Sequence, residues 1–187
     1  MKSRALAIAL AAGIALPQTA LACYHLSENV WMCAGQSVWQ AAEWDIYGDG
    51  STLVVDDYVL NFTEDFPGAE IKDDLSTLAE QFVTYAELAA ADGTAPLEIN
   101  TQDLLDIPAG SAFRSLQRDR YDGVETVSAV MLVEVSKARI MLYLDGPQKL
   151  DWDTVDVASR GVLDLIRDSC ADAATCASAN KSLETTE

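Results

Sequence analysis

The sequence has 187 residues, 50% of them hydrophobic, and its 30 Asp and Glu outnumber its 12 Lys and Arg, so the formal net charge is −18. A chain of this length provides one ordinary domain that can bury a core. The acidic excess repels nucleic acid and anionic membrane surfaces, so we expect no nucleic-acid partner. No stretch after the first 22 residues is long and uncharged enough to span a membrane, so no transmembrane segment is predicted.

The first 22 residues have the pattern of a secretory signal peptide. Lys2 and Arg4 precede an apolar run, and a small-x-small cleavage site ends at Ala22. Cleavage after Ala22 removes two basic residues and no acidic one, so the net charge of the mature chain becomes −20. We therefore expect a periplasmic or secreted bacterial protein. A lipoprotein anchored through Cys23 is the alternative, although Ala20 occupies a position where a lipobox usually has Leu.

Four cysteines in an exported chain predict two disulfides, for which three connectivities are possible. Pairing Cys23 with Cys33 and Cys170 with Cys176 closes the shortest loops, which costs the least chain entropy. Each bridge would then fix one terminus of the domain. The cysteine spacings fit no zinc pattern and the chain has a single histidine, so we predict no metal and no cofactor.

In the N-terminal half, residues 23–35 are predicted as a loop inside the small disulfide ring. Residues 38–47 begin like a helical turn and end in an extended pattern. Two short strands follow at 52–55 and 58–62, about an Asp56-Asp57 turn.

An apolar stripe of helical period predicts a helix from a cap at Asp73 or Asp74 to about Ala91. Residues 93–111 contain two prolines and several turn formers. They are predicted as a loop with one short strand at 97–100.

The centre of the predicted fold is a hairpin from Glu125 to Leu144. It consists of two runs rich in β-branched and aromatic residues, separated by a short polar segment. Both faces of these runs are apolar, which indicates that other elements cover the hairpin on both sides. An Asp122-Gly123 turn should join it to an extended segment at 112–121.

A closing helix is predicted from about Asp151 to Ser169, because apolar residues recur along it at helical spacing. Beyond Cys176 the chain is rich in Ala, Ser, Thr and Glu. The sequence thus predicts a single α+β domain at residues 23–176 and a disordered tail at 177–187.

The order of short strands, helix, loop, three antiparallel strands and closing helix resembles that of the Mog1/PsbP-like superfamily. The resemblance runs from about Trp44 to Ser169 and includes the characteristic ending, a strand at 139–144, a loop and a helix at 154–169. It implies an antiparallel β-sheet flanked by helices, an α/β sandwich. It also implies a binding or accessory module more often than an enzyme. The family has no shared catalytic set, so no functional residue carries over.

Catalysis would need His25, the single histidine, because every Ser-His-Asp or Cys-His arrangement uses an imidazole. No Gly-x-Ser-x-Gly elbow is present, and the Ser-x-x-Lys spacing at 178–181 lies in the polar tail. Residues 45–56 echo a calcium loop, but Tyr47 and Asp56 stand where two strong ligands are wanted. A plain turn is the better interpretation.

Arg114, Arg118 and Arg120 lie at alternate positions of one predicted strand, so their side chains share a face. Three guanidinium groups together could bind an anionic ligand. Pairing with acids on the neighbouring strand, such as Arg120 with Glu125, is the interpretation that we favour.

Trp31, Trp39 and Trp44 cluster near the start of the mature chain and are candidates for a ligand-binding wall or a partner surface. In a small domain such residues more often close one end of the core. These patterns together favour an exported acidic binding or accessory module of the bacterial cell envelope, with no catalysis of its own. Its ligand or partner is an unidentified small molecule or protein. A secreted hydrolase that uses His25 and a lipid-anchored interaction protein are the alternatives.

Overall fold

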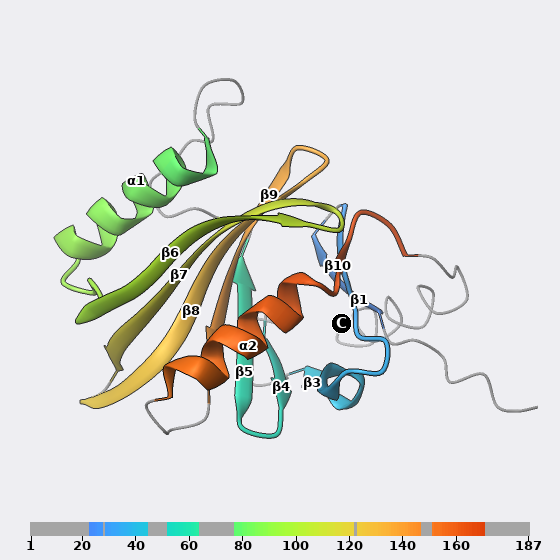
Figure 1. The fold of residues 1–187 in the computed structure, drawn as a ribbon, viewed down its shortest axis with the longest axis horizontal. Coiled ribbons are helices and arrows are strands. Elements are labelled where there is room, and N and C mark those ends of the chain that lie inside the picture. Colours follow the sequence, from blue (N-terminus) through green and yellow to red (C-terminus); the bar gives the residue numbers. More distant parts are fainter. Residues whose placement is uncertain are drawn as a thin grey trace, which may run out of the picture.

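The computed structural model describes residues 23–27, 29–44, 52–63, 77–121, 123–146 and 151–170. Within these ranges the chain forms two antiparallel sheets, two α-helices and one 3-10 helix, so the fold is α+β and rich in sheet (Figure 1). No helix in this described part of the chain is both long and apolar enough to cross a membrane. The predicted signal peptide, most of the calcium-like loop and the predicted tail lie outside the described residues.

Seven strands form the large sheet in the order β3-β4-β5-β9-β8-β7-β6, and three strands form the small sheet in the order β1-β2-β10. The strands of the large sheet are β3 (Glu43–Trp44), β4 (Thr52–Val55), β5 (Tyr58–Thr63), β6 (Glu98–Ile107), β7 (Gly110–Tyr121), β8 (Val124–Val135) and β9 (Ala138–Asp145). Those of the small sheet are β1 (Cys23–Ser27), β2 (Val30–Cys33) and β10 (Ile166–Arg167). The helices are η1 (Val38–Ala41), α1 (Leu78–Ala91) and α2 (Trp152–Leu163).

The predicted central hairpin is confirmed as β8 and β9, which are joined by Ser136 and Lys137. Both turn residues have positive φ, 49° and 76°, as a two-residue turn between twisted strands requires. Residues 127–133 of β8 are all buried. On β9, Ile140 is buried on one face and Met141 on the other. Cover on both faces of the hairpin, as predicted, is therefore confirmed.

The two helices pack against opposite faces of the large sheet (Figure 1). Leu78 and Phe82 of α1 pack with Val130, Leu132 and Met141. The intervening residues of β8 and β9 point to the other face, where they meet α2. The buried residues of α2 are Val155, Ser159, Val162 and Leu163.

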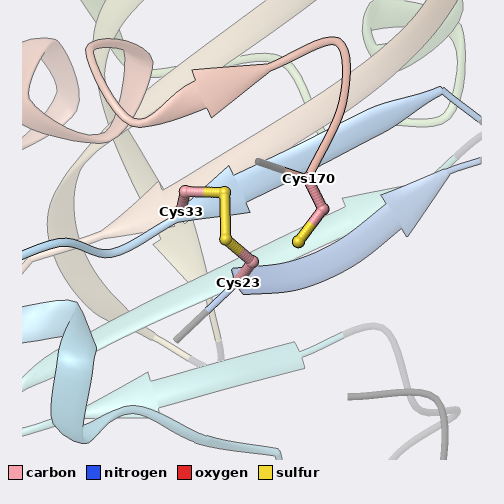
Figure 2. Close-up of side chains that lie close together, drawn as sticks. All are labelled: Cys23, Cys33 and Cys170. Atoms are coloured by element: carbon pink, nitrogen blue, oxygen red, sulfur yellow. A yellow bond between two sulfur atoms is a disulfide. The ribbon is translucent and has the colours of Figure 1, made fainter. Parts of the chain in front are cut away.

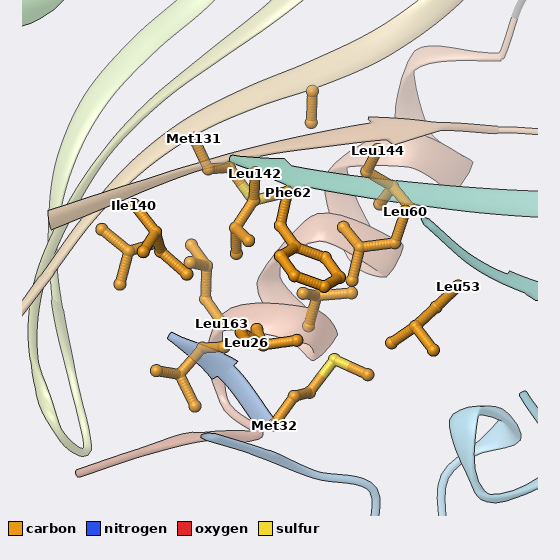
Figure 3. Close-up of a cluster of buried hydrophobic side chains, with 14 of the residues drawn as sticks. Leu26, Met32, Leu53, Leu60, Phe62, Met131, Ile140, Leu142, Leu144 and Leu163 are labelled. Carbon is orange, nitrogen blue, oxygen red and sulfur yellow. The ribbon is translucent and has the colours of Figure 1, made fainter. Parts of the chain in front are cut away.

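The small sheet closes the core on the α2 face of the large sheet. Figure 3 shows Leu26 and Met32 of the small sheet facing Leu60 and Phe62 of β5 across a cluster of buried side chains. Leu163 of α2 belongs to the same cluster. Because apolar residues from both sheets and from α2 share one core, burial of their surface stabilises all three layers together.

The loop predicted at residues 23–35 is wrong, because β1 and β2 form a hairpin there. The predicted disulfide between Cys23 and Cys33 is confirmed and joins these two strands. Tyr24 and Leu26 point into the core from alternate positions of β1. Cysteine, histidine and serine occupy the intervening positions, and their polarity gave the segment the composition of a loop.

Both helix predictions have the right location, and each is wrong at one end. The first helix begins after Thr77 instead of at residues 73–74, because Thr77 and Glu80 form a capping box. Each side chain of this pair accepts the other residue's backbone N–H. The closing helix starts where predicted, after its cap Asp151, but ends at Leu163 instead of near Ser169, since the chain then pairs with β2 as β10.

The loop predicted at 93–111 is also wrong, because Glu98–Ile107 forms β6 at the edge of the large sheet. Pro96 and Pro108 lie just outside this strand, where a missing N–H costs no ladder hydrogen bond. Many of its residues are polar and exposed because it is an edge strand. Its strand character depends on pairing with β7, which composition does not reveal.

Candidate functional site

A groove of about 590 Å³ lies between η1, the start of β5 and α2. Its lining residues are Ser37, Val38, Trp39, Tyr58, Asp153, Thr154, Val157, Ala158 and Gly161. Five of them belong to α2 and recur at helical spacing, so one stripe of that helix forms a whole wall. The neighbouring stripe, which includes Val155 and Val162, faces the core and fixes the helix in place.

Two aromatic rings line the groove opposite α2. The ring centroids of Trp39 and Tyr58 are 6.4 Å apart, with an angle of 48° between their planes. The hydroxyl of Tyr24 donates hydrogen bonds to the backbone oxygens of Trp39 and Ala42, both at 2.9 Å, and so holds η1 against β1. Burial raises the pKa of Tyr24, which keeps this hydroxyl protonated and able to donate.

The rim of the groove is apolar with one carboxylate. Val38 and Val157, both in the lining, are 55% and 70% exposed. Asp153 is exposed in the first turn of α2, where the helix dipole favours a negative charge. The Oγ of Ser37 is buried and has no hydrogen-bond partner among the described residues.

The electrostatics of this end of α2 are acidic. Asp151 caps the helix by accepting hydrogen bonds from the backbone N–H groups of Asp153 and Thr154. The hydrogen bonds from Thr154 lower the pKa of Asp151, so its carboxylate stays ionised well below neutral pH. No Lys, Arg or His belongs to the lining within the part of the chain that the structure describes.

Of the three predicted tryptophans, the groove contains Trp39, which is 4% exposed and also packs in the core. Trp44 instead packs against the core, where its ring centre lies 5.9 Å from that of Tyr24 and 5.6 Å from that of Phe62. Trp31 lies on the small sheet, where its ring centre is 4.4 Å from that of His25 and the two ring planes are tilted by 39°. The three side chains therefore do not form one wall.

The three arginines of the predicted cluster form ion pairs with Asp and Glu side chains. The side chain of Arg114 has no exposed surface and forms ion pairs with Asp103 at 3.0 Å and Asp156 at 2.7 Å. It also donates to the Oγ of Ser159 at 2.8 Å. Burial on its own would lower the pKa of Arg114, but hydrogen bonds and charges from both aspartates raise it, so the guanidinium stays charged. This buried group attaches α2 to β6 and β7.

Arg118 and Arg120 are paired as well. Arg118 lies 3.3 Å from a carboxylate oxygen of Glu98 and 5.5 Å from the ring centre of Trp152. Arg120 pairs with Glu125, the partner expected from the strand register. Because each guanidinium already has a carboxylate partner, the pairing interpretation accounts for the cluster without an anionic ligand.

The opposite face of the large sheet holds a polar cluster that the sequence did not reveal. Asp119 accepts hydrogen bonds from Tyr143 at 2.6 Å, from Gln117 at 2.9 and 3.0 Å, and from Ser128. Burial, followed by the charge of Asp119, raises the pKa of Asp145 to about 6. Burial and the hydrogen bond to Asp119 raise the pKa of Tyr143. With its oxygens engaged by three neighbours, Asp119 ties β7, β8 and β9 together.

The cysteines gather at the end of the small sheet. Figure 2 shows Cys170 beside the Cys23–Cys33 disulfide, and the three sulfurs lie within 4.8 Å of one another. Cys170 is also disulfide-bonded, and its predicted partner Cys176 lies outside the described residues. Sulfurs in disulfides are not thiolates, so these three offer no ligands to a metal ion.

Of the nine lining residues, the sequence identified only Trp39 as a candidate; the eight that it missed include Tyr58, Asp153, Val157 and Ala158. A signal for them was present in α2, where Val157 and Ala158 are apolar but lie off the buried stripe. Tyr58 gave no comparable signal, because only the pairing of β5 with β4 and β9 places it near η1.

No family model and no curated protein matches this chain. Among solved structures, the apo structure of the immunity protein TplEi of T6SS from Pseudomonas aeruginosa is similar, with 13% sequence identity and a TM-score of 0.42. The similar region covers 63% of this chain and 42% of that chain, so this chain spans less than half of the immunity protein. A likeness at this level assigns no function.

The buried ion pairs of Arg114 predict a large loss of stability in the Arg114→Ala variant. Removing the guanidinium empties a buried site and leaves Asp103 and Asp156 with the half-exposed Arg160 as their remaining described ion-pair partner, which should cost about 3 kcal/mol in the free energy of unfolding. Arg120→Ala is the matched control. It breaks an exposed pair and should cost less than about 1 kcal/mol. Urea denaturation of the two variants measures both values, and equal losses would contradict the assigned role.

The raised pKa of Asp145 predicts that this residue makes the folded protein less stable as pH rises. The unfolded state releases the proton near pH 3.8 and the folded state near pH 6, so the cost appears between these values and stays constant above them. The Asp145→Asn variant should therefore match the wild type at pH 4. At pH 7.5 it should be more stable by about 1 kcal/mol, a value discounted for solvent screening.

Thermal unfolding at the two pH values tests this, with the exposed edge-strand variant Asp106→Asn as control. A gain of the Asp145→Asn variant that is the same at both pH values would contradict the assignment.

Proposed function

We propose that this protein is an exported binding module that holds a small, mainly apolar ligand in the groove between η1 and α2 and catalyses no reaction of its own. The observation that carries this proposal is the groove itself. Its volume of about 590 Å³ lies in the range typical of small-molecule sites, roughly 300–1,000 Å³. Its lining combines aromatic and aliphatic side chains with a few polar groups, which is the usual composition of such sites.

The lining also supports binding over catalysis. Among the described residues it contains one carboxylate, Asp153, and no histidine or cysteine that could act as its partner. Acid–base and nucleophilic mechanisms need two or more groups held within hydrogen-bond reach. The hydrolase alternative depends on His25, which instead lies beside Trp31 in the small sheet.

Export is supported by two independent features. The first 22 residues have the composition of a signal peptide. The Cys23–Cys33 disulfide suits an oxidising compartment such as the periplasm or the extracellular medium. The lipid-anchored alternative would consume Cys23 and so break this disulfide, which makes a soluble module the better proposal.

We also propose that the large sheet with its two helices is an α/β sandwich of the Mog1/PsbP type. The support is the position of α1 and α2 on opposite faces of a seven-stranded antiparallel sheet. The small sheet and its disulfide would then be additions of this chain to that architecture.

The groove predicts binding of a neutral hydrophobic probe, N-phenyl-1-naphthylamine, whose fluorescence rises in an apolar site. Val157→Arg places a long charged side chain in the wall and should weaken probe binding at least about tenfold. Val83→Arg is the matched control, since Val83 is 56% exposed on α1 and does not line the groove. Fluorescence titration measures both. Equal affinities in the two variants, or no saturable binding by the wild type, would contradict the proposed function.

A further inference from the structure

We infer that the ligand of this groove carries a positive charge, and that it is a freely diffusing organic cation with a quaternary ammonium group and an apolar body. This inference rests on the proposed function and adds the charge and chemical class of the ligand. Three properties of the lining lead to it: the sign of its charge, its aromatic rings, and its shortage of hydrogen-bond partners.

The charges at the groove are negative. Asp153 belongs to the lining, and Asp151 caps the same end of α2. The N-terminus of a helix contributes only about half a positive charge, so two carboxylates outweigh it.

The basic residue of α2 does not cancel this charge. Arg160 forms ion pairs with Asp103 at 2.9 Å and with Asp156 at 3.3 Å, on the side of the helix that faces β6. Neither of these acids lines the groove. A cation that enters the groove therefore meets uncompensated carboxylate, within the described part of the chain.

The aromatic rings add a second attraction for a cation. The face of an indole or phenol ring is negative, and cations bind within about 6 Å of the ring centre. Trp39 and Tyr58 both line the groove, with centroids 6.4 Å apart and an angle of 48° between their planes. Trp39 is 4% exposed, so the partly exposed ring of Tyr58 is the more accessible of the two to a cation. Aromatic side chains beside a carboxylate are the usual means of recognising quaternary ammonium ions.

The type of cation follows from hydrogen bonding. A primary ammonium group has three N–H donors that must all be satisfied when it leaves water. The lining is mainly apolar, and beside Asp153 its side-chain acceptors are the hydroxyls of Ser37, Tyr58 and Thr154. The Thr154 hydroxyl is already hydrogen-bonded to Asp151, and the other three acceptors lie on different elements, so one ammonium group does not readily reach them all. A quaternary ammonium group has no N–H donors. Its methyl groups can also pack on Val157 and Ala158.

The test compares three solutes that share a phenol body: (3-hydroxyphenyl)trimethylammonium, its neutral carbon isostere 3-tert-butylphenol, and 3-hydroxybenzenesulfonate. Displacement of N-phenyl-1-naphthylamine gives their affinities for the wild type. We expect the cation to bind about three- to tenfold more tightly than the neutral isostere, and the sulfonate to bind most weakly.

Substitution of the carboxylate separates charge from shape. Asp153→Asn should lower the ratio of the affinity for the cation to the affinity for 3-tert-butylphenol at least about threefold. The Asp106→Asn control changes the net charge equally, but Asp106 lies on β6 outside the groove, so the ratio should stay at its wild-type value.

The outcomes distinguish the two proposals. Equal affinities for the three solutes would overturn the inferred charge and leave the proposed function intact. Failure of all three solutes and of the probe to bind would overturn both. The wild type is also tested for co-flotation with phosphatidylcholine vesicles. If it co-floats and Val157→Arg does not, the cation is a lipid headgroup, and the inference of a freely diffusing ligand is overturned.

Discussion

The buried guanidinium of Arg114 is the interaction on which the arrangement of this domain depends. It lies between β7 and α2 with no exposed surface and joins Asp103 of β6 to Asp156 of the helix. A buried charge is tolerated only where partners compensate it, so α2 is restricted to the positions that keep both aspartates in reach. Arg160 contacts the same two acids from the helix side and closes the network. Apolar burial beneath α2 supplies attraction without direction, whereas these ion pairs fix the register of the helix on the sheet.

The groove is a consequence of that register. One stripe of α2 packs in the core and contacts Arg114. The next stripe, which includes Val157 and Ala158, therefore faces η1 across the groove. The Tyr24 hydroxyl fixes the opposite wall by holding η1 on β1. Both walls thus depend on contacts buried outside the groove. Exposed valines therefore remain on its surface, together with Asp153, which has no ion-pair partner among the described residues. On the other face of the large sheet, Asp119 accepts a hydrogen bond from Tyr143. Burial and the charge of Asp119 there disfavour the ionised form of Asp145.

Sequence patterns predicted those elements in which the polarity of each residue matches its burial in the fold. The hairpin of β8 and β9 was predicted because residues that are buried on both faces are apolar on both faces. The pairing of Arg120 with Glu125 followed from the Asp122-Gly123 turn, since a two-residue loop fixes the register. The strands β1, β2 and β6 were missed for the opposite reason. The edge strand β6 is largely exposed and polar, and in β1 the positions on either side of Tyr24 and Leu26 hold Cys, His and Ser. Pairing with their partners, which composition does not show, makes these segments strands.

The sequence by itself determined the acidic charge, the Cys23–Cys33 disulfide, the central hairpin and the presence of two helices, because each depends on composition or on neighbours close in the chain. The sequence identified Trp39 as a candidate, but it did not show that Trp31 and Trp44 lie away from the groove. Tertiary structure alone decided the groove, the burial of Arg114 and the cluster about Asp119. These features bring together residues from η1, β5, β6, β7 and α2 that lie far apart in sequence. Their meeting depends on how sheets and helices pack, and no local period or motif encodes that packing.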